Sequence, residues 1–170
     1  ALPHGMPIIM GGDHSLALGT VAGVAAHAAA QGRAQFVIWL DAHSDFHTPM
    51  TTTSGNLHGT PMAYAAGRMG FDPFPPFPAP VPGENICLFG IRSVDPGEKR
   101  LVHEVGLDIY DMRYIDEIGM KRVMEDALDG VDPGRWLALP GPAQDLVSPA
   151  ELIAQVRTEL PDTLAPEDAA

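Results

Sequence analysis

Residues 36–45 read FVIWLDAHSD, an apolar run followed directly by polar residues. Its first five residues are apolar, with β-branched and aromatic side chains, which predicts a buried strand that ends at Asp41. Asp41, His43 and Asp45 then occupy alternate positions, so their side chains project to the same side where the chain leaves the sheet. Carboxylates with an imidazole suit borderline-hard divalent ions such as Mn²⁺. An exposed polar turn is the structural alternative.

The rest of the chain alternates between short apolar runs and helical patterns. Further strands are predicted at residues 6–10 and 85–91, and helices at 16–31, 61–69, 96–105 and 116–128. Loops are predicted at residues 46–60 and at the proline-rich residues 71–83. Strands that alternate with helices indicate an α/β fold with a mainly parallel sheet. In such sheets, binding sites collect at the carboxyl ends of the strands.

The composition restricts the function classes. A length of 170 residues predicts one domain, and a net charge of -12 argues against nucleic-acid binding, which needs a cationic surface. Cys87 is the only cysteine, which excludes an intrachain disulfide and a thiolate metal site and favours a reducing compartment. No apolar run approaches the roughly 20 residues that span a bilayer. We therefore expect a cytoplasmic protein with neither a membrane nor a nucleic-acid partner.

Three more polar clusters accompany the first. Residues 11–15 (GGDHS) follow an apolar run, and their two glycines permit a tight turn that presents His14, either as a ligand or as a helix-cap partner. Residues 54–59 (SGNLHG) form a flexible loop whose His58 could transfer protons near neutral pH, although such a sequence is often only a loop. Residues 95–98 (DPGE) place two carboxylates at a helix start, where capping is a sufficient explanation and recognition of a cationic group is the functional one.

In this order the clusters resemble the arginase family of ureohydrolases. The matching motifs are GGDHS at 11–15, DAHSD at 41–45, TTTSGNLHG at 51–59, GIRSVDPGE at 90–98 and the similar segment at 110–128. The resemblance covers about residues 6 to 128. It implies a three-layer α/β/α fold with a mainly parallel sheet around a binuclear manganese site.

The resemblance also implies a ligand set and a reaction. His14, Asp41 and Asp45 would hold one Mn²⁺. His43 would hold the second ion, which Asp41 would bridge to the first. A metal-bridging hydroxide, formed because shared coordination lowers the pKa of water, would attack the guanidinium carbon of L-arginine and yield L-ornithine and urea.

The same family pattern implies roles for the polar loops. His58 matches the proton-shuttling histidine of the family. The residues matched to recognition of the α-carboxylate and α-amino groups are Ser54, Asn56, Asp95 and Glu98. His47 stands in the carboxylate-contacting loop where many arginases have Asn, and an imidazole can still donate a hydrogen bond. Because agmatine has no carboxylate, these loops favour arginase over agmatinase.

One family motif is absent from the sequence. Arginases have an Asp-x-Asp pair after a later strand that completes both metal sites, and no Asp-x-Asp occurs in these 170 residues. The second ion would then keep only His43 and Asp41, and two protein ligands hold Mn²⁺ poorly. We expect an arginase-like catalytic core at residues 1–135, incomplete at both ends, and a divergent, partly disordered tail at 136–170.

Three functional interpretations stay open at this point. The first is an active, Mn²⁺-dependent arginase, for which full-length relatives imply a homo-oligomer. The second is an inactive arginase-derived chain that retains at most one metal site. The third is a related ureohydrolase, such as an agmatinase or a guanidino-acid hydrolase. An incomplete sheet also predicts exposed apolar faces and poor solubility as a monomer.

Overall fold

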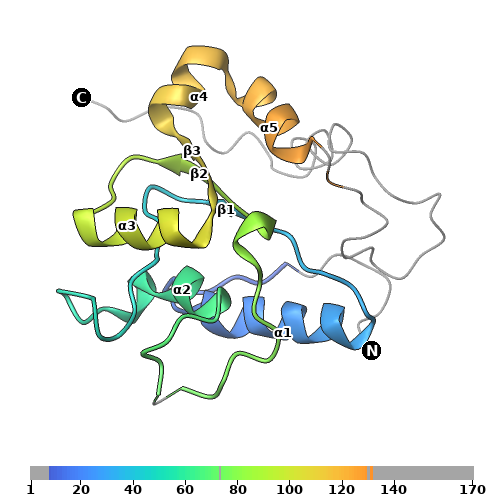
Figure 1. Cartoon of the computed structure of the whole chain (residues 1–170), viewed down its shortest axis with the longest axis vertical. Coiled ribbons are helices and arrows are strands. Elements are labelled where there is room, and N and C mark those ends of the chain that lie inside the picture. Colours follow the sequence, from blue (N-terminus) through green and yellow to red (C-terminus); the bar gives the residue numbers. More distant parts are fainter. Residues whose placement is uncertain (1–7, 73, 130, 132–170) are drawn as a thin grey trace.

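The computed structural model describes residues 8–72, 74–129 and 131 (Figure 1). The strands are β1 (Val37–Leu40), β2 (Ile86–Ile91) and β3 (Asp108–Asp111). The helices are α1 (Leu16–Ala30), α2 (Pro61–Ala65), α3 (Pro96–Val105), α4 (Met112–Ile118) and α5 (Met120–Leu128), with 3-10 turns at Leu57–Gly59 and Gly83–Asn85.

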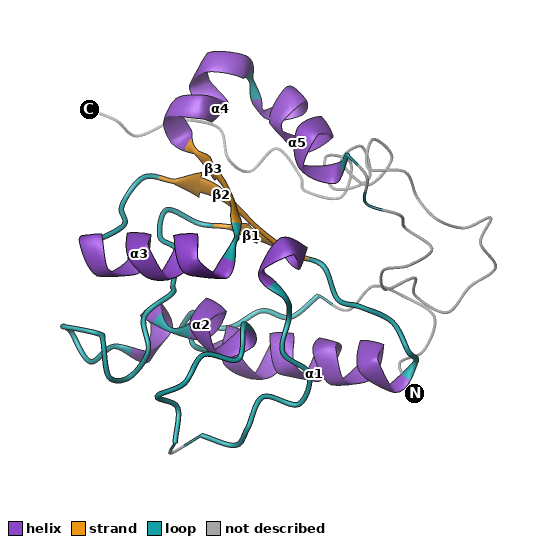
Figure 2. Cartoon of the chain, viewed as in Figure 1, coloured by secondary structure: helices purple, strands orange, loops and turns teal. Residues whose placement is uncertain are grey.

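The three strands form one parallel sheet in the order β1-β2-β3. Trp39 of β1 pairs with Leu88 of β2, and Phe89 of β2 pairs with Tyr110 of β3. Helices α1, α2 and α3 lie on one side of this sheet and α4 and α5 on the other, which gives a three-layer α/β/α arrangement (Figure 2). The predicted fold class is thereby confirmed.

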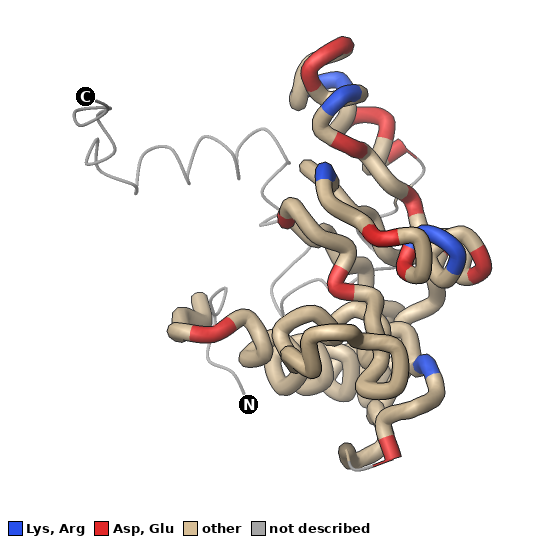
Figure 3. Tube along the Cα trace, turned by 90° about the vertical axis from the view of Figure 1, so that its left-hand side faces the viewer, with Lys and Arg blue, Asp and Glu red and all other residues tan. Residues whose placement is uncertain are grey.

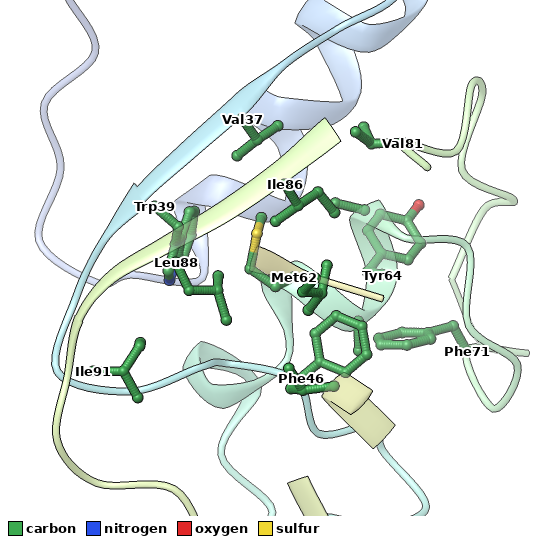
Figure 4. Packing of buried hydrophobic residues seen from close by; sticks show 14 residues of the cluster. Val37, Trp39, Phe46, Met62, Tyr64, Phe71, Val81, Ile86, Leu88 and Ile91 are labelled. Carbon is green, nitrogen blue, oxygen red and sulfur yellow. The ribbon is translucent and has the colours of Figure 1, made fainter. Parts of the chain in front are cut away.

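Alternation along the strands divides the core into two clusters. Val37, Trp39, Ile86 and Leu88 face α1, α2 and α3, where Met62 packs beneath them (Figure 4). On the opposite face, Cys87 and Phe89 pack against Ile115, Val123 and Ala127 of α4 and α5. Each fully buried large apolar side chain contributes about 1.5–3 kcal/mol relative to its exposed state, so both helix layers hold the sheet.

Several predicted elements are confirmed within a residue or two. The strands predicted at 36–40 and 85–91 correspond to β1 and β2, and the helices predicted at 16–31 and 96–105 to α1 and α3. Helix α3 begins with a capping box, because Asp95 accepts from the Glu98 N–H and the Glu98 side chain accepts from the Asp95 N–H. It ends at Gly106, whose φ of 74° is the left-handed conformation that glycine adopts readily.

The region after α3 was predicted incorrectly. The sequence analysis found no strand at β3, because this four-residue segment has an aspartate at each end and little apolar alternation. It also predicted one helix at 116–128, whereas the structure has two helices, α4 and α5. Gly119 separates them with φ 85° and ψ 144°, a conformation that an α-helix cannot contain. Helix α4 begins early because the Asp111 side chain accepts a hydrogen bond from the Tyr114 N–H.

Two further boundaries differ from the prediction. The strand predicted at 6–10 is not observed in its described part, residues 8–10, where Ile8 is 74% exposed. An apolar run becomes a strand only where a neighbouring strand satisfies its backbone groups. The helix predicted at 61–69 ends at Ala65, because Gly67 adopts a left-handed φ of 67°. The predicted tail at 136–170 lies outside the described residues.

The outer face of β1 is open. Ile38 and Leu40 point away from the larger core, and Leu40 is 70% exposed. This agrees with the prediction that the sheet has exposed apolar faces. The charged side chains gather mainly on α3, α4 and α5, whereas α1 and α2 contain no Lys, Arg, Asp or Glu (Figure 3). Among the described residues, no helix is long and apolar enough to cross a membrane.

Candidate metal centre

The loop after β1 is fixed to the carboxyl end of β2. The Asp41 N–H donates to the Phe89 carbonyl over 3.1 Å, which extends the parallel ladder by one residue. The Ala42 carbonyl then accepts from the N–H groups of Arg92 and Ser93, at 2.9 and 3.0 Å. These bonds hold the start of the D-A-H-S-D segment at the sheet edge where parallel folds place their sites.

His14, Asp41 and Asp45 converge at this edge. The His14 Nδ1 lies 3.4 Å from Asp41 Oδ2 and 3.3 Å from Asp45 Oδ2. One ligand atom from each of the three side chains lies within 4.8 Å of the others, a spacing that could hold one metal ion. His14 comes from the segment before α1, so two separate parts of the chain meet here, as their positions after two apolar runs predicted.

The Asp41 carboxylate lies between two histidines. Its Oδ2 faces His14, whereas its Oδ1 lies 3.4 Å from the His43 Nδ1 and accepts from the His43 N–H at 2.9 Å. The two oxygens of one carboxylate therefore point to different imidazoles. Such a carboxylate has the geometry to serve two cations at once.

Asp45 is the most buried acid of the centre. Burial and the neighbouring Asp41 carboxylate raise the pKa of Asp45 to about 6, while the nearby histidines and the Trp39 N–H oppose that rise. Asp45 also has a φ of 49°, a left-handed conformation that Asp and Asn tolerate better than most residues. A buried carboxylate beside a second carboxylate is stabilised by a cation, so this donor set fits a divalent metal ion.

Trp39 supports His14 and Asp45. This role of Trp39 was not predicted from the sequence. Its Nε1–H donates to Asp45 Oδ2 at 3.2 Å, and its ring stacks on the His14 ring with centroids 4.7 Å apart and planes 13° apart. Trp39 and Asp41 both lie on the strand-to-loop segment, two residues apart. That spacing was the available signal, because alternate residues of a strand face the same side.

The polar loop at 54–58 stands open to solvent. Ser54 Oγ accepts from the Asn56 N–H at 3.2 Å and lies 3.3 Å from Thr52 Oγ1, and Gly55 turns the chain between them with a φ of 74°. The His58 Nδ1 lies 3.8 Å from Asp13 Oδ2, which connects this loop to the segment that carries His14. Ser54 and Asn56 thus have room for a polar ligand.

A second cluster joins the other three predicted residues. His47 Nε2 lies 2.8 Å from Asp95 Oδ2 and 3.9 Å from Glu98 Oε2. Hydrogen bonds from the start of α3 and the nearby His47 side chain lower the pKa of Asp95. The spacing of this group could also hold a metal ion. The sequence analysis assigned His47 and Asp95 to one substrate end but could not show that they touch, since 47 residues separate them along the chain.

A pocket of about 550 Å³ opens on the His43 side of Asp41. Its lining residues are Leu40, Asp41, Ala42, His43, Phe89, Gly90, Arg92 and Met120. The His43 side chain is 60% exposed here. The space beside the second histidine is therefore accessible, and its lining includes the ionisable residues Asp41, His43 and Arg92.

Comparison with known proteins gives one consistent family. A model described as the arginase family matches residues 2–137. Curated arginases of Agrobacterium fabrum and Brucella suis are 55% and 56% identical over 126 and 129 residues, or 74% and 75% of this chain. These matches cover 39% and 42% of the relatives, so the chain spans about two fifths of their length.

Solved structures agree with the sequence matches. A crystal structure of arginase from Bacillus subtilis has a TM-score of 0.62 at 40% identity and covers 70% of this chain and 41% of that one. The native arginase structure from Bacillus caldovelox gives 0.61 at 41% identity, with 70% and 39% covered. These structural matches support the same family and the same α/β fold.

Proposed function

The chain belongs to the arginase family, and we propose that it carries out Mn²⁺-dependent hydrolysis of L-arginine to L-ornithine and urea. This is the action of a hydrolase on the C–N bond of a linear amidine. The main observation that supports the proposal is the position of the Asp41 carboxylate. His14 and Asp45 lie on one side of it, and His43 lies on the other. The curated relatives named arginase supply the substrate class.

The ligands divide into two groups. His14, Asp41 and Asp45 would hold one Mn²⁺, and His43 with the second oxygen of Asp41 would hold another. When bound, the two ions would supply a water molecule activated as a nucleophile, because cations lower its pKa. The protein residues keep these side chains in place before any ion arrives, which reduces the reorganisation required on binding.

His58 would transfer the proton that the leaving amine needs. Its side chain is about half exposed, so it can exchange protons with solvent, and Asp13 lies 3.8 Å from its Nδ1. A histidine titrates near neutral pH and can both donate and accept a proton in one turnover. Its connection to the His14 segment supports a role beside the metal centre.

The amino-acid end of arginine would meet the two polar clusters. Ser54, Asn56 and His47 would donate hydrogen bonds to the α-carboxylate. Asp95 would receive the α-amino group with help from Glu98, since an exposed carboxylate attracts a cation. We infer a cytoplasmic protein from the single cysteine, and a homo-oligomer for the full-length family.

A second candidate function rests on a specific observation. His43 joins no group of three ligand side chains among the described residues, and the sequence has no Asp-x-Asp motif. An arginase-derived chain that holds one metal ion without turnover is the corresponding alternative. A related ureohydrolase, such as an agmatinase or a guanidino-acid hydrolase, is the other.

Urea release separates these functions. The Mn²⁺-loaded chain is incubated with L-arginine or agmatine, and a His58→Ala chain serves as the blank. We expect urea from arginine, little from agmatine and none above background from the blank. A folded chain that binds Mn²⁺ and releases no urea would leave the one-metal alternative, whereas preference for agmatine would identify a different ureohydrolase.

A further inference from the structure

The Glu98 carboxylate is buried and accepts hydrogen bonds from other groups of the protein. Glu98 lies in the first turn of α3 and is only 6% exposed. Its Oε1 accepts a hydrogen bond from Ser44 Oγ at 2.7 Å and another from the Phe46 N–H at 3.1 Å. Both donors are completely buried. Burial of a carboxylate is costly unless hydrogen bonds compensate for the lost water, and these two bonds go to a single loop.

These two donors flank the metal-ligand candidate Asp45. Ser44 precedes it and Phe46 follows it, so the Glu98 carboxylate holds the chain on both sides of the residue. The Asp45 carbonyl in turn accepts from the N–H groups of Met62 and Ala63 at the start of α2. Phe46 is further fixed because its ring packs in the larger core with Met62 (Figure 4). The left-handed backbone at Asp45 is thereby held by contacts from two helices.

The other oxygen of Glu98 faces His47 and Asp95, the residues proposed to bind the amino-acid end of arginine. Its Oε2 accepts from the Asp95 N–H at 3.4 Å and lies 3.9 Å from the His47 Nε2. One buried carboxylate therefore contacts both clusters that the sequence singled out. A partly exposed Asp95 is open to a ligand, whereas Glu98 is enclosed by protein groups.

We propose that Glu98 is a positioning residue for the metal centre, which holds the Ser44–Phe46 loop so that Asp45 faces His14 and Asp41. The proposal rests on the proposed function, because it takes these three side chains as the metal ligands. It gives Glu98 a role that Asp95 does not share: Glu98 acts through the ligand loop, in addition to the help that it would give Asp95 at the substrate end. Residues that orient metal ligands typically change metal affinity about 10–100-fold when they are removed.

Mn²⁺ affinity, measured without arginine by titration calorimetry, tests the proposal. We expect Glu98→Ala to bind Mn²⁺ at least about tenfold more weakly than the parent chain. Glu98→Gln keeps a carbonyl oxygen that can accept from both donors, so its affinity stays within about threefold. Glu104→Ala on the same helix is the matched control, because Glu104 is exposed and its ion-pair partner among the described residues is Arg68, at 3.7 Å. We expect Glu104→Ala to bind Mn²⁺ with the same affinity as the parent chain.

Two further readouts separate positioning from other roles. Amide hydrogen exchange of the Phe46 N–H should become faster in Glu98→Ala and stay slow in Glu98→Gln. Ser44→Ala removes one of the two bonds without emptying the Glu98 site, and we expect Mn²⁺ binding several-fold weaker even if Glu98→Ala fails to fold.

Each contrary result overturns the proposal. Equal Mn²⁺ affinity in Glu98→Ala and the parent chain would show that the loop needs no such support. Equal losses in Glu98→Gln and Glu98→Ala would assign the effect to charge, and a parent chain that binds no Mn²⁺ would remove the centre itself. A parent chain that binds Mn²⁺ but releases no urea would defeat the proposed function alone, since none of these affinities depends on turnover.

Discussion

The two sides of the Asp41 carboxylate are built differently. On one side, His14 and Asp45 approach its Oδ2 and are supported by Trp39, which stacks on His14 and donates to Asp45. On the other side, His43 is the side chain that approaches Oδ1 among the described residues, and 60% of it is exposed beside an open pocket. A charged side chain binds a cation tightly where neighbours fix it and exclude water. The described residues therefore fix the side chains on the His14 side of Asp41 better than His43 on the other side.

The largest expected effect comes from the residue that both sides share. Asp41→Asn removes the charge from both oxygens while it keeps the size of the side chain. We expect no saturable Mn²⁺ binding up to about 1 mM, because a neutral amide is a much weaker ligand for a hard cation. Electron paramagnetic resonance of free Mn²⁺ measures this directly. Binding within a few-fold of the parent chain would place the metal elsewhere.

Two matched substitutions compare the sides themselves. We expect His14→Ala to weaken the tightest Mn²⁺ site about 100-fold, since it deletes a ligand of the supported side. His43→Ala should change that site by no more than about twofold, because the His43 imidazole lies against the other oxygen of Asp41. His103→Ala, at an exposed position of α3, is the control. Equal losses for His14 and His43 would contradict the asymmetry.

Trp39 tests what supports the stronger side. Trp39→Phe keeps an aromatic ring against His14 and removes the N–H that donates to Asp45. A hydrogen bond of this kind contributes about 1 kcal/mol, so we expect the tight site to weaken roughly fivefold. The same titration measures it, and circular dichroism verifies the fold. An unchanged affinity would mean that stacking alone orients the ligands.

The smallest effect concerns the stability of the metal-free chain. The pKa of Asp45 is about 6 in the folded protein and lower when unfolded, so the folded state binds the proton more tightly. The free energy of unfolding therefore falls as the pH rises from about 4 to about 7, where Asp45 loses its proton. Asp45→Asn should stabilise the metal-free chain by about 1 kcal/mol near pH 7.5 and by less near pH 5.

Thermal melting at the two pH values checks this prediction. Asparagine also tolerates the left-handed backbone at this position, so the substitution adds little strain. Asp116→Asn, an exposed acid of α4, should leave the melting temperature almost unchanged at both values. A destabilised Asp45→Asn chain near pH 7.5 would show that its negative charge is already compensated without a metal ion.

Local patterns in the sequence predicted the sheet edge and the candidate metal ligands that lie there. The apolar run before Asp41 and the alternation of Asp41, His43 and Asp45 require only strand geometry, and the structure brings Asp41 and Asp45 together with His14. Helix α3 was predictable because Asp95 and Pro96 are strong start signals. These features depend on neighbours within a few residues.

Features that depend on distant partners were not predictable. The link from Glu98 to Ser44 spans 54 residues, and no local pattern indicates that one carboxylate holds the metal-ligand loop. The strand at β3 depends on pairing with β2, since two of its four residues are aspartates. Residues 8–10 show the reverse, because an apolar run there has no strand pairing among the described residues.

A Mn²⁺ titration of the parent chain, followed by electron paramagnetic resonance of the free ion, tests the central claim most directly. The structure predicts one tight ion for each chain, lost in His14→Ala, and any second ion bound at least about 100-fold more weakly. Two ions of equal affinity, or a tight ion that survives in His14→Ala, would contradict the unequal metal centre at Asp41.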